Sequence, residues 1–518
     1  MKRRALFFWP LLLAFTASSL LWLVWAPSST NALYRAIPAS ATFLGVHRDL
    51  SGRWDALSSN PLLLALLESL GTEPSEVERL RDDPGFRELL RLLGSDELVL
   101  AYVPRMRSSG ESAWVFAAPL GGQSQRLRWM LKSGKMPDCK RAATRNGWLV
   151  WVWAPRELKG QRIAFALVEG QVVGCIASGT LGIDEVLGCV DGNFASLANR
   201  PERLPAETPV ADRGWYRNEQ GQRFPYEFAL TPAGGLQASV QTPWRMPPAD
   251  GLATGVVKQL AGWADLVGGR SVAAAAFDPA LMRDWVRTAF TNAVGREVAD
   301  LLAMEGAGPS GMALLGGDYS GRFMAVRLPT LVAGVAGSPS NQLKQVSSAL
   351  DRLNALTRWG LVSSPVMAGS VPLYVIEATD GGLYGGLAHE ENLAYTPTED
   401  GLVWSSNLST LERLVKEQAA GWQTNAQPWR AELDRLASGQ ARGFLWFDAA
   451  EGAKVVRLGV TAWSLKLLLE DPEGTQATRQ RMNDFKAWMD TLSPLGHIAV
   501  GWEDRNGQAT ITLRAGDL

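Results

Sequence analysis

The sequence has few of the residues from which active sites and metal sites are usually built. Its 518 residues include three histidines and three cysteines, and no H-E-x-x-H, C-x-x-C, G-x-S-x-G or S-x-x-K spacing occurs. Carboxylate pairs of the glycosidase kind stay open, because their two members lie far apart in a sequence. From these absences we expect no catalytic residue, no cofactor and no metal ligand, and hence a protein that is not an enzyme.

The histidines and cysteines favour structural roles. His47 and His497 lie in predicted strands without the usual catalytic partners nearby. His389 precedes two glutamates, but adjacent side chains point in different directions, so a solvated loop is favoured over a metal site. Cys175 and Cys189 could form a disulfide in an oxidising compartment, whereas buried free thiols are the preferred interpretation.

An excess of charge of either sign is also missing. The formal net charge is −1, which gives no field that would attract nucleic acid, so nucleic acid is not expected as a partner. The composition is 46% hydrophobic and 20% charged, as in ordinary globular proteins. The length allows about two to four domains.

One long uncharged segment stands at the N-terminus. Residues 1–4 contain three basic side chains and would form a cytoplasmic stub, and residues 5–26 are apolar. This run could cross a hydrocarbon core of about 30 Å as a helix, whereas a cleaved signal peptide has an apolar centre of only about 7–15 residues. We therefore predict a single-pass transmembrane signal anchor with the bulk of the chain exported. Cleavage near Ala32 is the alternative.

A G-x-G-x-x-G pattern, formed by Gly306, Gly308 and Gly311, raises the question of a dinucleotide site. In such a site a strand precedes the glycines and a helix follows them. Here the order is reversed, because a helical pattern precedes the glycines and two strands around a turn follow them. The pattern therefore predicts a helix end and no cofactor.

The sequence contains an internal repeat. Residues 164–181 match residues 394–411 without a gap, 230 positions apart, and both predict a strand, a turn, a second strand and a helix start. The helix starts are marked by Gly179-Thr180 and Ser409-Thr410. Further segments match in the same order along the chain: 43–57 with 273–286, 97–120 with 312–329, 212–219 with 441–448, and 226–242 with 497–513.

These matches predict two homologous lobes, residues 36–244 and 251–518, joined by a proline-rich linker. Tight turns between strands, with helices between the hairpins, indicate an α+β fold with antiparallel or mixed sheets. A doubly wound parallel sheet is not expected.

The stretch GWLVWVWAP is the one candidate for a binding surface. As a strand it would place Trp151 and Trp153 on one face and Trp148 on the other, so that both faces are apolar. A buried strand is the preferred interpretation. The functional alternative is a groove for an acyl chain or an apolar peptide, with Trp148, Trp151 and Trp153 as its wall.

Three short elements lie at characteristic places in this arrangement: Pro38-Ala39-Ser40-Ala41 in the first strand, Gly94-Ser95-Asp96-Glu97 before the first hairpin, and the strand and helix VVGCIASGTLGIDEVL. With the membrane segment before them, they resemble a family of anchored bacterial proteins of unknown function that is common in cyanobacteria. The resemblance implies a bacterial inner or thylakoid membrane and a duplicated extracytoplasmic domain. It supplies no catalytic residues.

The expected function is therefore that of a non-enzymatic envelope protein. The helix at residues 5–26 would hold it in the membrane, where it would bind another envelope component or assist its assembly. A carrier of hydrophobic ligands or lipids is the second hypothesis, and an unrecognised hydrolase is the third. The sequence does not determine the partner, the ligand or the oligomeric state.

Overall fold

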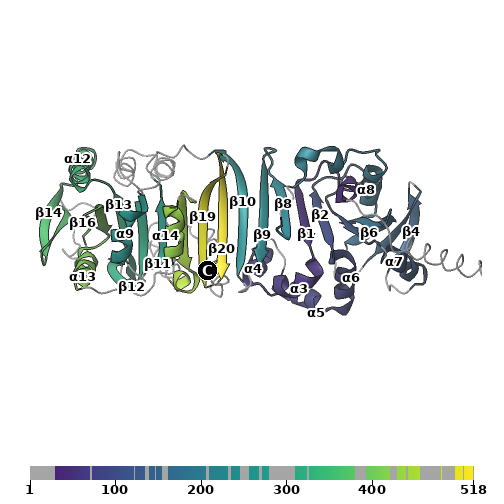
Figure 1. Ribbon diagram of the computed structural model, residues 1–518, viewed down its shortest axis with the longest axis horizontal. Coiled ribbons are helices and arrows are strands. Elements are labelled where there is room, and N and C mark those ends of the chain that lie inside the picture. The colour runs from purple at the N-terminus through teal and green to yellow at the C-terminus, as the bar shows by residue number, and fades with distance from the viewer. Residues whose placement is uncertain are drawn as a thin grey trace, which may run out of the picture. The chain divides into compact units, whose positions relative to one another are not determined.

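The computed structural model describes most of the chain (Figure 1). The described residues are 30–69, 73–121, 123–134, 139–145, 147–154, 161–205, 209–230, 235–245, 256–267, 271–278, 310–323, 326–379, 392–420, 429–438, 441–454, 480, 483, 496–505 and 507–516. No helix within these ranges is long and apolar enough to span a bilayer. The predicted span at residues 5–26 lies outside them.

The chain divides into two compact units, Met1–Leu230 and Thr231–Leu518. The sequence predicted a boundary between residues 244 and 251. The difference concerns strand β10 (Leu236–Arg245), which pairs with β20 (Gln508–Gly516), the last strand of the chain. Every strand pair described below is antiparallel, and helices cover the sheets, so the predicted α+β class is confirmed.

The sheet of the first unit has nine strands in the described residues. They are β1 (Phe43–Arg48), β2 (Glu97–Val103), β3 (Ala113–Pro119), β4 (Cys139–Arg145), β5 (Trp148–Trp153), β6 (Arg162–Val168), β7 (Gln171–Ala177), β8 (Asp212–Arg217) and β9 (Arg223–Leu230). Their order across the sheet is β9-β8-β1-β2-β3-β7-β6-β5-β4. Apolar side chains occur on both faces, as in sheets that are covered on both sides.

Helices cover both faces of this sheet. They are α2 (Thr30–Arg35), α3 (Leu50–Ser58), α4 (Pro61–Ser69), α5 (Pro74–Asp82), α6 (Pro84–Gly94), α7 (Gln123–Lys132) and α8 (Gly182–Val190), with short 3₁₀ turns η2 (Leu197–Asn199) and η3 (Pro201–Arg203). One face packs against α3, α6 and α7, and the opposite face packs against α2, α8 and η2. The unit therefore consists of three layers with a core on each side of the sheet.

Local sequence explains where helix α6 begins. Asp83 precedes Pro84, and its carboxylate accepts hydrogen bonds from the backbone N–H groups of Gly85 and Phe86. Proline at the first helical position lacks the N–H that would otherwise stay without a partner, so this order favours a helix start. Helix α8 differs from the prediction, because it begins at Gly182 and not at Gly179-Thr180.

The second unit has eleven strands in the described residues. They are β10, β11 (Ser271–Phe277), β12 (Ser310–Phe323), β13 (Val326–Ala336), β14 (Leu361–Ala368), β15 (Val371–Ala378), β16 (Ala394–Thr398), β17 (Gly401–Ser405), β18 (Gly443–Asp448), β19 (His497–Arg505) and β20. Their order is β10-β20-β19-β18-β11-β12-β13-β17-β16-β15-β14. From β19 to β14, this order is the same as the order from β9 to β4 in the first unit, with ten added to each strand number.

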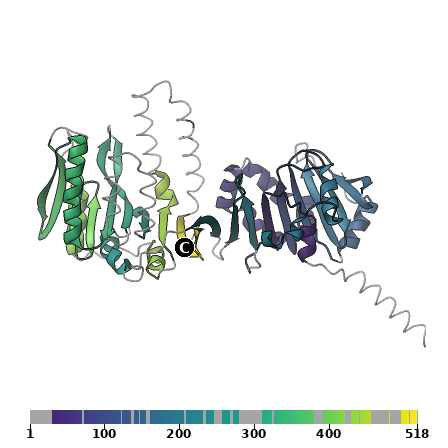
Figure 2. The same ribbon diagram turned by 90° about the horizontal axis from the view of Figure 1, so that it is seen from above.

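The helices of the second unit are α9 (Val256–Val267), α12 (Pro339–Thr357), α13 (Leu408–Ala419) and α14 (Arg430–Ala437). One face of the sheet packs against α9, α13 and α14, and the other packs against α12. Figure 2 shows α12 lying beside the strands of this sheet. Helix α13 begins at Leu408, and the side chain of Asn407 caps it by accepting from the N–H of Thr410, so Ser409-Thr410 lie inside its first turn.

The last glycine of the G-x-G-x-x-G pattern is explained by close packing of a helix on the sheet. Gly311 lies in β12, and a Cβ atom there would approach the ring of Trp263 to 2.7 Å. Gly334 in β13 faces the same ring at 2.6 Å. Both glycines therefore let the helix α9 pack closely on the sheet. Gly306 and Gly308 lie outside the described residues.

Candidate functional site

The first unit contains an apolar cavity of about 310 Å³ between its sheet and the helices on one face. The helices contribute Leu50, Trp54, Phe86, Leu90, Leu93 and Leu127. The strands contribute Leu98, Leu100, Phe116, Trp153, Ile163, Phe165, Val172 and Ile176. No lining residue carries a charge, so the cavity offers only hydrocarbon and aromatic contacts.

Two helices that follow β1 form the wall opposite the sheet. Leu50 and Trp54 stand four residues apart on α3 and therefore on one face of the helix. Phe86, Leu90 and Leu93, spaced by four and then three residues, also lie on one face of α6. The ring of Trp54 contacts that of Phe86 with centroids 5.4 Å apart, which closes the wall between the two helices.

The structure separates the three tryptophans that the sequence singled out. Trp153 lines the cavity, and Trp151 is buried in the cluster around it. Trp148 lies on the opposite face of β5, where its indole N–H donates to Asp191 Oδ1 at 3.1 Å. The predicted alternation of faces is present, but only Trp153 takes part in the cavity wall.

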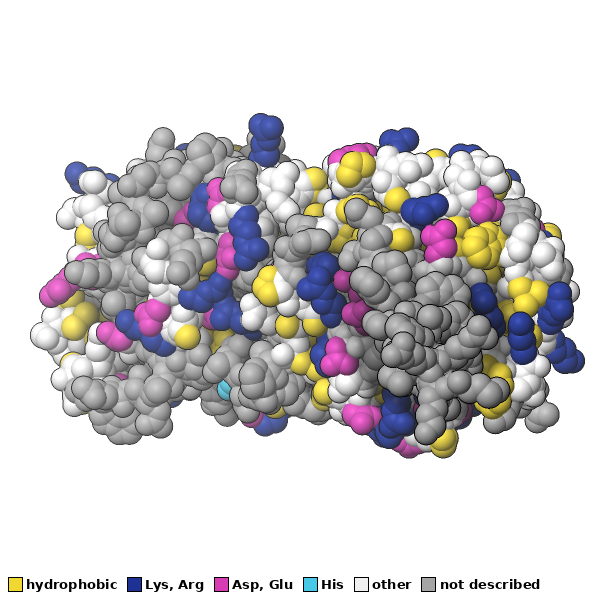
Figure 3. Space-filling model, turned by 45° about the vertical axis from the view of Figure 1, so that its right-hand side comes forward, with side chains coloured by type: hydrophobic (Ala, Val, Ile, Leu, Met, Phe, Trp, Pro, Cys, Tyr) yellow, Lys and Arg dark blue, Asp and Glu magenta, His cyan; other side chains and the backbone are white. Residues whose placement is uncertain are grey.

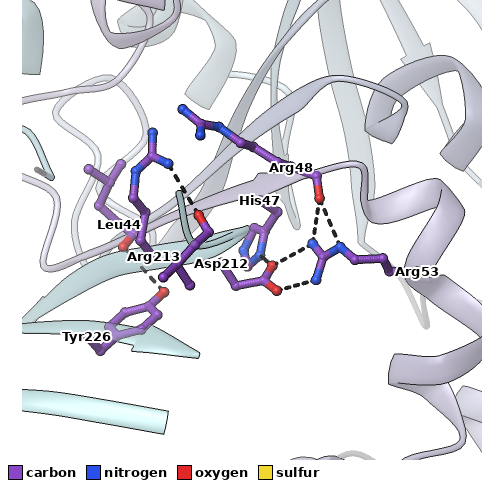
Figure 4. Close-up of polar contacts among 8 residues, drawn as sticks. Leu44, His47, Arg48, Arg53, Asp212, Arg213 and Tyr226 are labelled. Carbon is purple, nitrogen blue, oxygen red and sulfur yellow. Dashed lines mark hydrogen bonds and ion pairs between the residues drawn. The ribbon is translucent and has the colours of Figure 1, made fainter. Parts of the chain in front are cut away.

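A polar cluster beside the cavity joins helix α3 to the sheet (Figure 4). Asp212 on β8 is fully buried, and its carboxylate accepts from Nδ1 of His47 on β1 at 2.8 Å and from the guanidinium of Arg53 on α3. Arg53 also donates to the carbonyl oxygen of Arg48 at 2.6 Å. Because Arg53 stands next to Trp54, these bonds hold the cavity wall in place.

The charge of Asp212 is stabilised by its partners. Burial alone would raise the pKa of this carboxyl, but the hydrogen bonds and charges of His47 and Arg53 hold it below the usual range. Tyr226 on β9 lies near the same carboxylate, and burial, with a smaller contribution from Asp212, raises the pKa of its hydroxyl. The cluster therefore contains an ionised aspartate and a neutral tyrosine at neutral pH.

Within the described ranges, His47 does not take part in a catalytic triad of the serine or cysteine hydrolase kind. In the part of the chain that the structure describes, its ring bonds to Asp212, and no serine, threonine or cysteine donates to it. His497 at the start of β19 stacks near Trp446 with centroids 5.2 Å apart. His389 lies outside the described residues, and no group of three metal-ligating side chains occurs within them.

The three cysteines are free, as preferred on sequence grounds. Burial raises the pKa of Cys139 to about 11 and those of Cys175 and Cys189 to about 12, with smaller contributions from Asp184 and Glu185 to the latter two. Since the thiolate is the reactive form, burial lowers the reactivity of these thiols.

Sequence reasoning missed the helical half of the cavity wall. The spacing of Phe86, Leu90 and Leu93 indicates an apolar helix face, but that face could equally have packed against the sheet without a gap. Only the positions of α3 and α6 on the sheet create the space. No family model, no curated protein and no solved structure matches this chain. The family resemblance therefore stays a prediction.

Proposed function

We propose that this protein is a non-enzymatic, membrane-anchored extracytoplasmic protein that binds a hydrophobic ligand in the cavity of its first unit. The observation that supports this function is the cavity itself, whose walls are apolar throughout. The anchor is the apolar segment 5–26. The polar cluster around Asp212 has a structural part in this proposal, because it positions α3.

The size and chemistry of the cavity favour an acyl chain. Its volume of about 310 Å³ is roughly twice that of an engineered apolar cavity that stays dry and binds benzene. An aliphatic chain needs no hydrogen-bond partner, and the walls of the cavity offer none. Each buried methylene would add about 0.8 kcal/mol to binding, or roughly fourfold in Kd.

Binding of another envelope component, or assistance in its assembly, was the first expectation from sequence. Both roles share the anchor and the extracytoplasmic location that the family resemblance implies. We place the hydrophobic ligand first because a cavity is a defined structural feature, whereas no comparable feature identifies a protein partner.

We further propose that the two units descend from one duplicated domain. The argument is the shared strand order and the shared register of one hairpin. In the β6–β7 hairpin Phe165 faces Gly174, and in the β16–β17 hairpin Tyr395 faces Trp404, each 230 positions later. An experimental structure in which these hairpins differ in register would contradict the duplication.

The pairing of β10 with β20 supports the same origin. Gln237-Ala238-Ser239-Val240 in β10 resembles Gln508-Ala509-Thr510-Ile511 in β20. In the antiparallel register Val240 lies directly opposite Ile511. Strands with the same sequence pattern therefore pair within the second unit.

A chain-length series tests the ligand class. Fatty alcohols of increasing length would displace a fluorescent polyene fatty acid from the purified full-length protein in detergent-free nanodiscs. The affinity should rise by roughly fourfold per methylene until the cavity is full and then level off. Because the bilayer also takes up alcohols, empty nanodiscs provide the partition correction. An affinity that shows no plateau would contradict a cavity of fixed size.

A cavity-filling variant tests the site. Val172→Phe places a ring in the cavity and should abolish displacement, with the melting temperature showing that the fold is kept. Leu356→Phe changes an exposed residue of α12 and serves as the matched control. If Val172→Phe folds and binds the polyene as the wild type does, the ligand does not occupy this cavity.

A further inference from the structure

Five aromatic side chains form one row across the sheet of the first unit. Each lies directly opposite the next in the strand register, from β9 through β8, β1 and β2 to β3. The members are Phe224, Tyr216, Phe43, Tyr102 and Trp114, and they are called the aromatic row. Successive strands lie about 4.8 Å apart, so the row extends about 19 Å.

The aromatic row is partly open to solvent. Tyr216 is 49% exposed and Trp114 is 41% exposed, while the other members are half-buried. Trp114 contacts Tyr102 and Phe43 with ring centroids 5.3 and 5.6 Å apart. Tyr216 and Phe224 form a second group, with ring centroids 6.3 Å apart.

The aromatic row continues into the cavity wall. Trp114 faces Ile176 on β7, Ile176 faces Ile163 on β6, and Ile163 faces Trp153 on β5. Ile176, Ile163 and Trp153 all line the cavity. An acyl chain could pass from the aromatic row into the cavity without leaving an apolar surface.

The corresponding row of the second unit is largely aliphatic. The residue 230 positions after Ile176 is Ser406. Following the strand registers from Ser406, Leu331, Leu314 and Ala273 take the places of Trp114, Tyr102 and Phe43. Phe447 takes the place of Tyr216. The same strand order therefore forms without aromatic side chains at three of these places. The fold alone does not explain the aromatic row.

Basic side chains border the aromatic row. They are Arg105 and Arg107, both exposed in the connection that follows Tyr102. The connections β2–β3 and β8–β9 contain two acidic residues, Glu111 and Glu219. Figure 3 shows hydrophobic, basic and acidic side chains interspersed on the face of the molecule in view. Arginines at the edge of an aromatic surface are a combination that favours the bilayer interface.

The start of the chain brings this end of the sheet near the proposed anchor. The predicted span ends at Ala26, and Leu33 is already buried in the core, so the seven residues reach at most about 25 Å. Strand β1 then begins at Phe43. The N–H of the preceding residue, Thr42, donates to the carbonyl oxygen of Tyr102 at 2.9 Å. The chain therefore enters the sheet at the aromatic row.

We propose that the aromatic row docks into the head-group layer of a phospholipid bilayer and that the ligand of the cavity is an acyl chain taken from that bilayer. This inference rests on the proposed function and names the source of its ligand. Aromatic rings settle at the boundary between head groups and acyl chains, and the arginines pair with lipid phosphates.

A spin label beside the aromatic row tests the docking. Ser112 is exposed two residues before Trp114, and Ser112→Cys is labelled in a chain whose three native cysteines are replaced by alanine. The full chain is reconstituted in vesicles of phosphatidylcholine with phosphatidylglycerol. Collisions of the label with oxygen should rise, and collisions with a water-soluble nickel complex should fall. Gln123→Cys, exposed at the opposite end of β3, should show neither change.

A second variant links the result to the aromatic row. In the Ser112→Cys chain, Trp114→Ser with Tyr216→Ser should return the label to its value in water, whereas Leu331→Ser in the second unit should have no effect. Unchanged melting temperatures show that the variants fold.

A label that stays accessible to the nickel complex in these vesicles overturns the docking, even if the label is immobilised. Displacement of the polyene would then still support the cavity. If the label enters lipid while Val172→Phe binds the polyene normally, the proposed function fails and the docking stands as a membrane contact alone.

Discussion

The two units have the same strand order but differ in how one face of the sheet is filled. In the first unit Gly174 of β7 faces Phe165 of β6, and the helices above leave a cavity. In the second unit the corresponding pair is Trp404 and Tyr395, whose ring centroids lie 4.6 Å apart. One change from glycine to tryptophan adds a large ring at the same place. Side-chain volume, and not the course of the strands, thus distinguishes these two faces.

The buried acidic residues of the two units also differ. In the first unit the pKa of Asp212 is lowered, because its hydrogen bonds to His47 and Arg53 outweigh burial. In the second unit Glu432 bonds to Arg435 and Arg514, yet its pKa is raised, mainly by burial and also by the nearby Glu503, against the lowering effect of Arg435. The carboxylate with the raised pKa, Glu432, is thus the one that shares Arg435 with a second acid, Glu503.

Removal of Asp212 should produce the largest effect on the first unit. Asp212→Ala leaves Arg53 and His47 without their buried partner, and we expect a loss of about 4 kcal/mol in the free energy of unfolding. Urea denaturation followed by circular dichroism measures it. Glu412→Ala breaks an exposed pair with Lys416 in the second unit and should cost less than about 0.5 kcal/mol. Equal losses for the two variants would disprove the structural role of the Asp212 cluster.

Trp404→Gly should make the second unit resemble the first. The variant loses the contact between Trp404 and Tyr395 and should lower the free energy of unfolding by about 3 kcal/mol. Hydrogen exchange of the β16–β17 hairpin, with β6–β7 as the internal reference, localises the loss. A variant as stable as the wild type would show that the ring does not fill this face.

Gly174→Ala examines the same place in the first unit. A Cβ atom at Gly174 would lie 2.5 Å from Phe116 Cζ and 2.6 Å from the carbonyl oxygen of Ala164. We expect about 2 kcal/mol of destabilisation by thermal denaturation, because the backbone atom cannot give way freely. Gly179→Ala, whose nearest neighbour would be 3.8 Å away, should change stability by less than about 0.5 kcal/mol. A tolerated Gly174→Ala would mean that Phe116 and β6 have room to move.

Acid should have the mildest, graded effect. Because the pKa of Asp212 is lowered in the folded state, its charge stabilises the fold above the usual aspartate pKa of about 3.9, and this stabilisation is lost as the pH falls through the folded-state pKa. The difference in unfolding free energy between wild type and Asp212→Asn should therefore be full at pH 7 and shrink below about pH 4. Urea titrations at several pH values measure it. A difference that grows on acidification would contradict the lowered pKa.

Much of the fold was predictable because it follows from local patterns. The hairpins β6–β7, β12–β13 and β16–β17 and the strand β5 were all expected from apolar spacing and turn residues. The pairing of β10 with β20 was not, because a strand's own pattern does not name its neighbour. In the candidate site, Trp153 was predictable from sequence because it lies in a continuous apolar strand. Nothing in the sequence indicated that Trp54 and Phe86 line the same cavity.

The sequence by itself determined the elements, their order, and the repeated pattern at an offset of 230, because these depend on residues close together in the chain. Only the tertiary structure decided that Trp54, Phe116 and Trp153 enclose one space and that Phe43, Trp114 and Tyr216 stand in one row. Such groupings depend on strand register and on how closely helices approach a sheet. Both are set by the packing of whole surfaces, which no short stretch of sequence contains.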